Sequence, residues 1–331
     1  MKALYFNKYG QVSGIRVKEV ETPKVKEKQV LVKVMAASIN DWDLGIIRGK
    51  PWINRLLFGL LKPKIKVVGS DIAGLIEAIG PGVDQFKVGD RVYGDLSNDG
   101  FGGFAEYVVA GQNHLRPMTK TMTFKQAACL PQAGVLAYQG LNDFTDIRPG
   151  MAICVNGAGG GVGTYLGQLL KDQGVHLTGV DAEVKRDLCL NLGYDDFIDY
   201  QKEDFTQGSR EYDLIIDCKT LRRPKAYSSC LKKDGYYISL GGHMSKIIGM
   251  MLFSKHLYKK YGQYFKVVQL KTNGYLEELN DLYDRGDLIS VEDPNTFGLD
   301  QAKEAMIYYA SGQQLGKVLI DLERKGGEDH G

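Results

Sequence analysis

The 331-residue sequence predicts an α/β protein of two domains. Length alone gives about two domains at roughly 150 residues each. Residues 1–122 contain short apolar runs broken by glycine, a pattern typical of antiparallel strands that form a barrel-like domain. From residue 123 onward, strands alternate with segments of helical period, which is typical of βαβ units. The second domain is therefore expected to be a doubly wound parallel sheet.

The elements of the first part follow from local periodicity. Residues 29–36, QVLVKVMA, alternate apolar and polar side chains as a half-buried strand does. Residues 66–80 read as strand, glycine break and strand, and residues 86–94 and 101–110 predict further strands. A helix is expected over residues 41–47.

In the second part the period changes. An apolar strand over residues 151–156 runs into a glycine-rich loop, a helix over residues 164–174 and a strand over residues 175–180. The Met-rich and Lys-rich residues 244–265 show no regular period. Further strands are expected at residues 197–200, 212–217, 235–240, 264–270 and 316–321, and further helices at residues 274–286 and 299–312.

Composition excludes several classes of protein. The 42 Lys and Arg residues nearly balance 40 Asp and Glu residues, so no nucleic-acid partner is expected. Five cysteines without a CxxC pair disfavour a disulfide framework and a four-cysteine zinc site. The sequence begins without a signal peptide and has no apolar run long enough to span a bilayer. We therefore expect a cytoplasmic protein with no membrane partner.

The glycine-rich loop predicts a dinucleotide site. Gly157, Gly160 and Gly163 stand between a strand and a helix, where glycine permits a tight turn and close approach of a diphosphate to the helix N-terminus. Asp181 ends the next strand, and a carboxylate there accepts the ribose hydroxyls of NAD and repels a 2′-phosphate. Lys185 and Tyr200 could instead contact a phosphate, although Lys185 could equally lie on a solvated helix face. The balance favours NADH only slightly over NADPH.

A family resemblance rests on motifs spread along nearly the whole chain. In order they are residues 37–40 (ASIN) with Asp43, residues 69–74 (GSDIAG), residues 88–92 (VGDRV), residues 102–107 (GGFAEY), the glycine loop, Asp199-Tyr200 and residues 316–318 (GKV). Together they resemble the medium-chain dehydrogenase/reductase superfamily, and within it the zinc-independent quinone oxidoreductase branch that includes zeta-crystallin.

The resemblance implies a particular organisation. A GroES-like, partly open β-barrel catalytic domain is expected over residues 1–123 and 275–323, and a Rossmann nucleotide-binding domain over residues 124–274, with a flexible tail at residues 324–331. The nicotinamide is expected in the cleft between the domains. By the same resemblance, residues 264–270 pair with their twin across a two-fold axis to give a homodimer.

The resemblance also points away from zinc. The positions of the catalytic cysteine and histidine ligands of zinc-dependent relatives hold Asn40 and Ser70 here, and neither is a credible zinc ligand. Without a Lewis acid, an unactivated alcohol is hard to oxidise. Quinones and α,β-unsaturated carbonyls need less help, because hydrogen-bond donors can stabilise the anion left by hydride transfer. We expect an NAD(P)H-dependent reductase of such small hydrophobic acceptors. An alcohol or aldehyde dehydrogenase and a non-enzymatic nicotinamide-binding protein remain alternatives.

The candidate catalytic residues are Asn40 and Asp43. Asn40 could orient the nicotinamide or an acceptor carbonyl, or it could merely cap the following helix, and Asp43 is expected to pair with a basic group rather than to transfer protons. The candidate cofactor-binding residues are Gly157, Gly160, Gly161, Val162, Gly163, Asp181, Lys185, Tyr200, Gly241, Gly242 and His243. His243 could donate a proton or be an exposed loop residue.

The candidate substrate-pocket residues are Trp52 and Leu136. Trp52 opens the apolar stretch of residues 52–61, which covers a hydrophobic pocket or packs as ordinary core. Residues 244–257 form a second pocket wall or rest on a membrane surface. The sequence departs from the family where Leu136 replaces a threonine beside the nicotinamide, and where Cys218, Lys219 and Thr220 replace a glycine turn. No metal site is expected.

Overall fold

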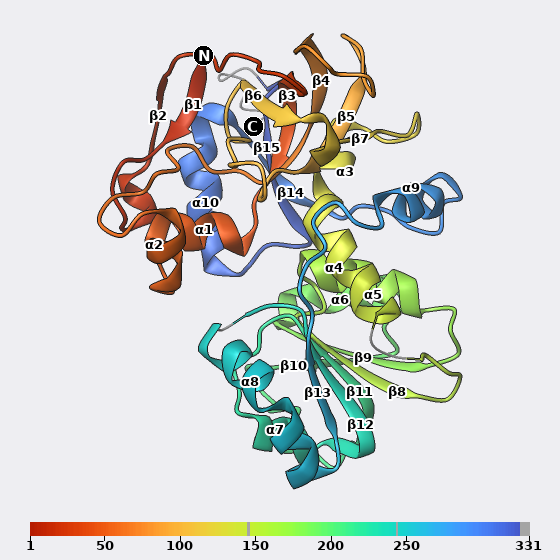
Figure 1. Cartoon of the computed structure of the whole chain (residues 1–331). Helices are drawn as coiled ribbons and strands as arrows, with labels where there is room; N and C mark the ends of the chain where they lie inside the picture. Colours follow the sequence, from red (N-terminus) through yellow and green to blue (C-terminus); the bar gives the residue numbers. More distant parts are fainter. Residues whose placement is uncertain (144–145, 243, 325–331) are drawn as a thin grey trace. The chain divides into compact units, whose positions relative to one another are not determined.

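The computed structural model describes residues 1–143, 146–242 and 244–324 and divides the chain into two compact units (Figure 1). The first unit comprises Met1–Gln132, Thr272–Asp284 and Ser290–Gly331, and the second comprises Ala133–Lys271 and Arg285–Ile289. Residues 124–132 thus join the first unit, whereas the sequence analysis put them in the second. The reason is the short helix α3 (Phe124–Cys129), whose Ala127, Ala128 and Cys129 are fully buried.

The first unit is built on a mixed sheet in the order β14-β15-β3-β4-β5-β7, with β6 paired to β3 and a separate β1-β2 ribbon. Its strands are β1 (Lys2–Tyr5), β2 (Arg16–Glu19), β3 (Gln29–Ser38), β4 (Asp71–Ile79), β5 (Arg91–Asp95), β6 (Tyr107–Gly111), β7 (Arg116–Pro117), β14 (Glu292–Gly298) and β15 (Lys317–Asp321). Its helices, besides α3, are α1 (Asp41–Arg48), α2 (Ile53–Phe58), α9 (Leu276–Asp284) and α10 (Ala302–Ser311).

The long strand β3 organises this unit. Val30, Val32 and Val34 are buried on one face, as the alternation in the sequence predicts. Strand β3 pairs antiparallel with β4, β6 and β15, so the last strand of the chain returns to complete the first sheet. The expected strand–glycine–strand over residues 66–80 is one strand, β4, preceded by an isolated bridge at Val67.

The second unit is a parallel sheet of six strands in the order β10-β9-β8-β11-β12-β13. Its strands are β8 (Ala152–Asn156), β9 (His176–Asp181), β10 (Asp196–Asp199), β11 (Tyr212–Asp217), β12 (Leu231–Ser239) and β13 (Tyr264–Val267). Its helices are α4 (Pro131–Asn142), α5 (Gly161–Leu170), α6 (Arg186–Asn191), α7 (Pro224–Ser228) and α8 (Met244–Tyr261). Counted within the unit, the order is 3-2-1-4-5-6, which is that of the doubly wound Rossmann fold.

One expectation about this unit is wrong. The stretch predicted to be irregular contains the 18-residue helix α8. Its buried residues Ile247, Met250 and Leu257 face the unit's core, but large apolar residues on its exposed face hide the amphipathic period. Among the described residues, no helix is long and apolar enough to cross a bilayer.

Candidate functional site

The order of the second sheet reverses between β8 and β11, and ligands of open α/β sheets bind at the carboxyl ends of strands beside such a reversal. Asn156 ends β8 and Asp217 ends β11, and the Asn156 side-chain amide donates to Asp217 Oδ1 at 2.9 Å. The glycine loop begins at the next residue, Gly157, whose φ of +95° turns the chain toward helix α5. The predicted strand–loop–helix is therefore present at the expected edge.

Two glycines of the loop have different surroundings. A Cβ on Gly163 would lie 2.2 Å from the carbonyl oxygen of Gly157, so this glycine is required by the turn itself. A Cβ on Gly160 would meet nothing nearer than that same oxygen at 3.4 Å. Gly160 is the N-cap of α5, where unpaired amide groups and the positive end of the helix dipole favour an anion. A side chain at Gly160 would thus meet little of the protein, and Gly161 and Val162 are the first residues of the helix.

Asp181 and Lys185 form a buried ion pair beside this loop. Asp181 accepts hydrogen bonds from the amides of Gly159 at 3.0 Å and Ala182 at 2.9 Å, and Lys185 Nζ lies 3.3 Å from Asp181 Oδ1. Both side chains are almost fully buried. Lys185 is therefore not on a solvated helix face, and its ammonium offsets the carboxylate predicted to select NADH.

A second loop at the same edge follows β11. Asp217 Oδ1 accepts from the backbone amides of Lys219 and Thr220 at 2.8 and 2.9 Å. Thr220, which stands where the family has a glycine turn, takes a positive φ of 45°, and its hydroxyl donates to the carbonyl of Gly241 at 2.6 Å. A Cβ on Gly242 would lie 1.8 Å from the carbonyl oxygen of Lys219, so these two loops fit closely.

The other predicted residues of this unit are placed as follows. Tyr200 directly follows β10 with its ring half exposed, and Leu136 lies half-buried on α4. His243 lies outside the described residues. Sequence reasoning missed Asp217, although its place at a strand's carboxyl end was a usable signal. It also missed that the stem of Lys219 covers Gly157, where a Cβ would lie 3.3 Å from Lys219 Cε.

In the first unit, three strand ends converge on Asn40. The register pairs Ser38 of β3 with Asp71 of β4 on one side and with Leu319 of β15 on the other. The residues just beyond these pairs therefore meet: the Asn40 amide donates to Ser70 Oγ at 3.1 Å, and Lys317 Nζ donates to Asn40 Oδ1 at 2.5 Å. Asn40 is also the N-cap residue of α1, and its side chain is held in one orientation.

Asp43 holds this arrangement through backbone groups. Its Oδ2 accepts from the amide of Asn40 and its Oδ1 from the amide of Gly69, both at 2.9 Å. The expected pairing of Asp43 with a basic group stays a prediction: its hydrogen-bond donors are these two amides, and the ammonium of Lys317 acts on it through its charge. Complete burial raises the pKa of Asp43 to about 7, against the lowering effect of the two amides.

Lys317 is the functional residue that sequence reasoning missed in this unit. Its side chain is 3% exposed, and its ammonium lies 3.6 Å from Asp71 Oδ2 and also donates to the carbonyl of Ile39 at 3.3 Å. Burial raises the pKa of Asp71, and the ammonium of Lys317 opposes that rise. Lys317 belongs to the GKV motif of residues 316–318, but a lysine at the start of a final strand otherwise reads as an ordinary surface position.

The residues around Asn40 do not fit a zinc ion. Asn40 and Ser70 offer no strong ligand, and the ammonium of Lys317, bonded to Asn40, would repel a divalent cation. Within the described part of the chain, no group of three His, Cys, Asp or Glu side chains is arranged to hold a metal ion. We therefore derive no step through zinc.

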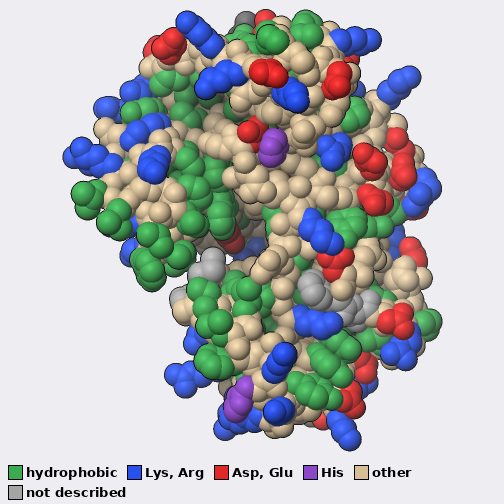
Figure 2. Space-filling model, in the orientation of Figure 1, with side chains coloured by type: hydrophobic (Ala, Val, Ile, Leu, Met, Phe, Trp, Pro, Cys, Tyr) green, Lys and Arg blue, Asp and Glu red, His purple; other side chains and the backbone are tan. Residues whose placement is uncertain are grey.

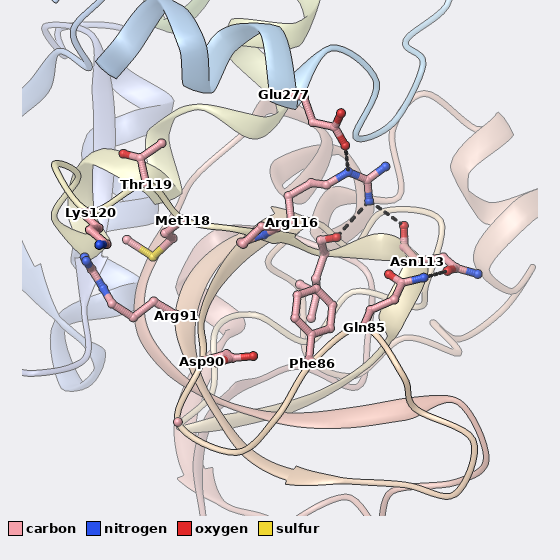
Figure 3. Close-up of a pocket in the computed structure, with 13 residues that line it drawn as sticks. Gln85, Phe86, Asp90, Arg91, Asn113, Arg116, Met118, Thr119, Lys120 and Glu277 are labelled. Atoms are coloured by element: carbon pink, nitrogen blue, oxygen red, sulfur yellow. Dashed lines mark hydrogen bonds and ion pairs between the residues drawn. The ribbon is translucent and has the colours of Figure 1, made fainter. Parts of the chain in front are cut away.

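The first unit also contains a hollow of about 780 Å³ (Figure 3). Phe86 and Met118 line it together with Arg116, which approaches Glu277 at 3.7 Å and donates to the carbonyl of Asn113 at 3.2 Å. None of the predicted site residues lines this hollow. Because Arg116 is satisfied by its neighbours, the hollow gives no indication of a ligand. Trp52, predicted to line a substrate pocket, is 70% exposed.

A Rossmann unit with a glycine loop is typical of nucleotide-dependent oxidoreductases, and here it is joined to a β unit with a buried polar cluster. Family models agree with both parts. Residues 26–120 match the alcohol dehydrogenase GroES-like domain, and residues 192–320 match the zinc-binding dehydrogenase domain.

Individual relatives indicate which group of oxidoreductases the chain resembles. The chain is 30% identical to the 2-methylene-furan-3-one reductase of Solanum lycopersicum and 30% identical to a chloroplastic NADPH-dependent alkenal/one oxidoreductase of Arabidopsis thaliana, each over 97% of this chain and 79% of the relative. The structure of the quinone oxidoreductase from Coxiella burnetii superposes with a TM-score of 0.86 at 26% identity, covering 97% of this chain and 99% of that one. The chain belongs to the medium-chain dehydrogenase/reductase superfamily, in its quinone oxidoreductase branch.

Proposed function

We propose that this protein uses NADH or NADPH to reduce quinones or α,β-unsaturated carbonyls without a metal. The observation that carries the proposal is the set Asn40, Ser70 and Lys317, which supplies hydrogen-bond donors and a buried ammonium where zinc-dependent relatives place metal ligands. The relatives named for alkenal and methylene-furanone reduction support the same class of acceptor.

The chemistry follows from the acceptor. A bound reduced nicotinamide supplies a hydride. An enone that receives the hydride at its β-carbon becomes an enolate, which water protonates to the saturated ketone, and a quinone gives its hydroquinone in the same way. The amide of Asn40 is the group we assign to the acceptor carbonyl or the carboxamide of the nicotinamide, while Asp43 and Lys317 hold Asn40 in place.

An acceptor series tests this proposal. Untreated and EDTA-treated protein are each mixed with NADH or NADPH and with phenanthrenequinone, a 2-alkenal or the matching saturated aldehyde. We expect loss of nicotinamide absorbance with the quinone and the 2-alkenal, and a product of the alkenal that has gained two hydrogens at its C=C bond. Turnover confined to the saturated aldehyde and abolished by EDTA would identify an alcohol or aldehyde dehydrogenase instead. Nicotinamide binding without turnover of any acceptor would identify a non-enzymatic binding protein.

We propose that the protein discriminates only weakly between NADH and NADPH and slightly prefers NADH. Asp181 is the acceptor for ribose hydroxyls, but Lys185 Nζ at 3.3 Å reduces its repulsion of a 2′-phosphate. The neighbouring charges also cancel, because Glu183 binds both Arg186 and Lys202. The name of the Arabidopsis thaliana relative, which specifies NADPH, fits a site that tolerates the phosphate.

Lys185→Met should make the protein more selective for NADH. Methionine keeps the stem that covers Gly159 but removes the ammonium, so the full charge of Asp181 then faces a 2′-phosphate. We expect the NADPH-to-NADH ratio of kcat/KM to fall about tenfold. Lys171→Met, an exposed lysine of the same unit, serves as the control. An unchanged ratio in Lys185→Met would show that Lys185 does not act on the cofactor.

Two further proposals concern the state of the protein. Strand β13 is an edge of the six-stranded sheet and pairs with β12 alone, which supports a homodimer formed by its pairing with a second β13. The buried cysteines Cys129, Cys154, Cys189 and Cys230 are free thiols, which supports a reducing compartment such as the cytoplasm.

A further inference from the structure

Residues 48–66 of the first unit, here named the α2 segment, carry an exposed apolar surface. Five large side chains point outward: Trp52, Leu56, Leu57, Leu60 and Leu61. Leu61 is 87% exposed. Single exposed apolar side chains are normal on protein surfaces, whereas five within residues 52–61 form a patch. Figure 2 shows hydrophobic side chains grouped over α2 with Lys and Arg beside them.

The α2 segment is held firmly by its inner residues. The ring of Phe58 packs edge-on between Trp42 and Phe101, at centroid distances of 6.2 and 5.8 Å. Tyr9 donates to the carbonyl of Gly59 at 2.6 Å, and the buried Asn54 donates to the carbonyl of Lys50 at 3.1 Å. The outward apolar side chains are therefore presented by an anchored segment.

All charged residues of the α2 segment are basic. Between Asp43 and Asp71 the chain has six basic residues and no acidic one. The second unit has a counterpart: between Asp234 and Glu277 there are six lysines and no acidic residue, and this stretch includes the exposed Leu252 and Phe253 of α8. The two stretches hold 12 of the 42 Lys and Arg residues and none of the 40 Asp and Glu residues, although the whole chain is nearly neutral.

We propose that the α2 segment docks on the surface of a bilayer that contains anionic lipid. Leucine and tryptophan side chains enter the headgroup and acyl boundary, and flanking lysines attract anionic headgroups. A second copy of this face is a poorer partner, because two-fold pairing would set six basic residues against six. No membrane partner was expected from the sequence. The sequence does not reveal that these side chains are exposed, whereas the fold does. The proposal does not rest on the reductase activity.

Vesicle binding tests the proposal. The protein is sedimented with vesicles of phosphatidylcholine and with vesicles in which phosphatidylglycerol replaces about a third of the lipid. We expect binding to the anionic vesicles that weakens with added salt, because salt screens the lysines. Equal binding to both vesicles, or none to the anionic ones, would overturn the proposal.

Paired variants localise the contact. Leu60→Ser with Leu61→Ser, and separately Lys62→Ala with Lys64→Ala, should each reduce vesicle partitioning at least about tenfold. The matched controls are Ile79→Ser with Val88→Ser, and Lys24→Ala with Lys26→Ala, which are exposed residues of the same unit. Unfolding curves verify that each variant is folded. If the leucine pair abolished a dimer in sedimentation and left vesicle binding intact, the occupant would be a second copy and the proposal would be wrong. The pair Leu252→Ser and Phe253→Ser should retain most of the binding if the α2 segment is the principal contact.

Discussion

Lys317→Met is expected to lower the free energy of unfolding of the first unit by about 3–5 kcal/mol. The ammonium of Lys317 is buried 3.6 Å from Asp71, a carboxylate that is completely buried itself. Methionine has a similar length but leaves that carboxylate without its cation, and removing one partner of a buried ion pair is far costlier than removing both. Urea unfolding measures the loss. Lys87→Met, an exposed lysine of the same unit, should change the stability by less than about 0.5 kcal/mol.

A second variant separates charge from packing. Lys317→Met combined with Asp71→Asn should recover most of the stability, because the uncompensated charge is gone while an amide oxygen still accepts from Gln132 and Ser38. The double variant should still reduce acceptors poorly, since Asn40 has lost the donor that fixes its Oδ1. An equally low stability in the single and double variants would show that lost packing, rather than the charge of Asp71, causes the effect.

Much of the order of elements in both units could be predicted from sequence because it depends on local patterns. The alternation in β3 and the glycine loop after β8 are signals carried by neighbouring residues. Asn40 was found because its motif is local as well. The glycine loop and Asn40 therefore needed no knowledge of the rest of the fold.

The burial of single charged residues could not be predicted in this way. Lys317 reaches Asn40 only because β15 pairs antiparallel with β3, which joins residues 277 positions apart. Lys185 is buried because its side chain lies over Gly159 and binds Asp181. Helix α8 was missed for a related reason: large apolar side chains such as Leu252 and Phe253 lie on its exposed face beside the lysines, so the helical period is masked. Contacts with residues distant in the sequence bury Lys317 and Lys185, and the lack of such contacts leaves apolar side chains of α8 exposed.

Gly160→Ala should separate nucleotide binding from folding. The backbone of Gly160 is extended, with φ of −89° and ψ of 177°, and a Cβ there would make only one contact within 4 Å, at 3.4 Å from the carbonyl oxygen of Gly157. The protein itself therefore accommodates the methyl group, and the urea midpoint should stay close to that of the parent. The methyl group would project into the space in front of α5 that we assign to the diphosphate. We expect the Kd for NADH and NADPH, measured by calorimetry, to rise at least about tenfold.

Variants at two other glycines of the same unit are the controls for this result. Gly163→Ala should lose stability and nucleotide binding together, because its Cβ would collide with backbone oxygens of Gly157 and Ala158 at 2.2 and 2.4 Å. Gly249→Ala, in helix α8 with open space around it, should lose neither. Unchanged nucleotide affinity in a folded Gly160→Ala protein would mean that the diphosphate does not lie at the N-terminus of α5. A loss of affinity without a loss of stability in Gly160→Ala would arise from the space the glycine leaves open, since the fold of the loop does not depend on it.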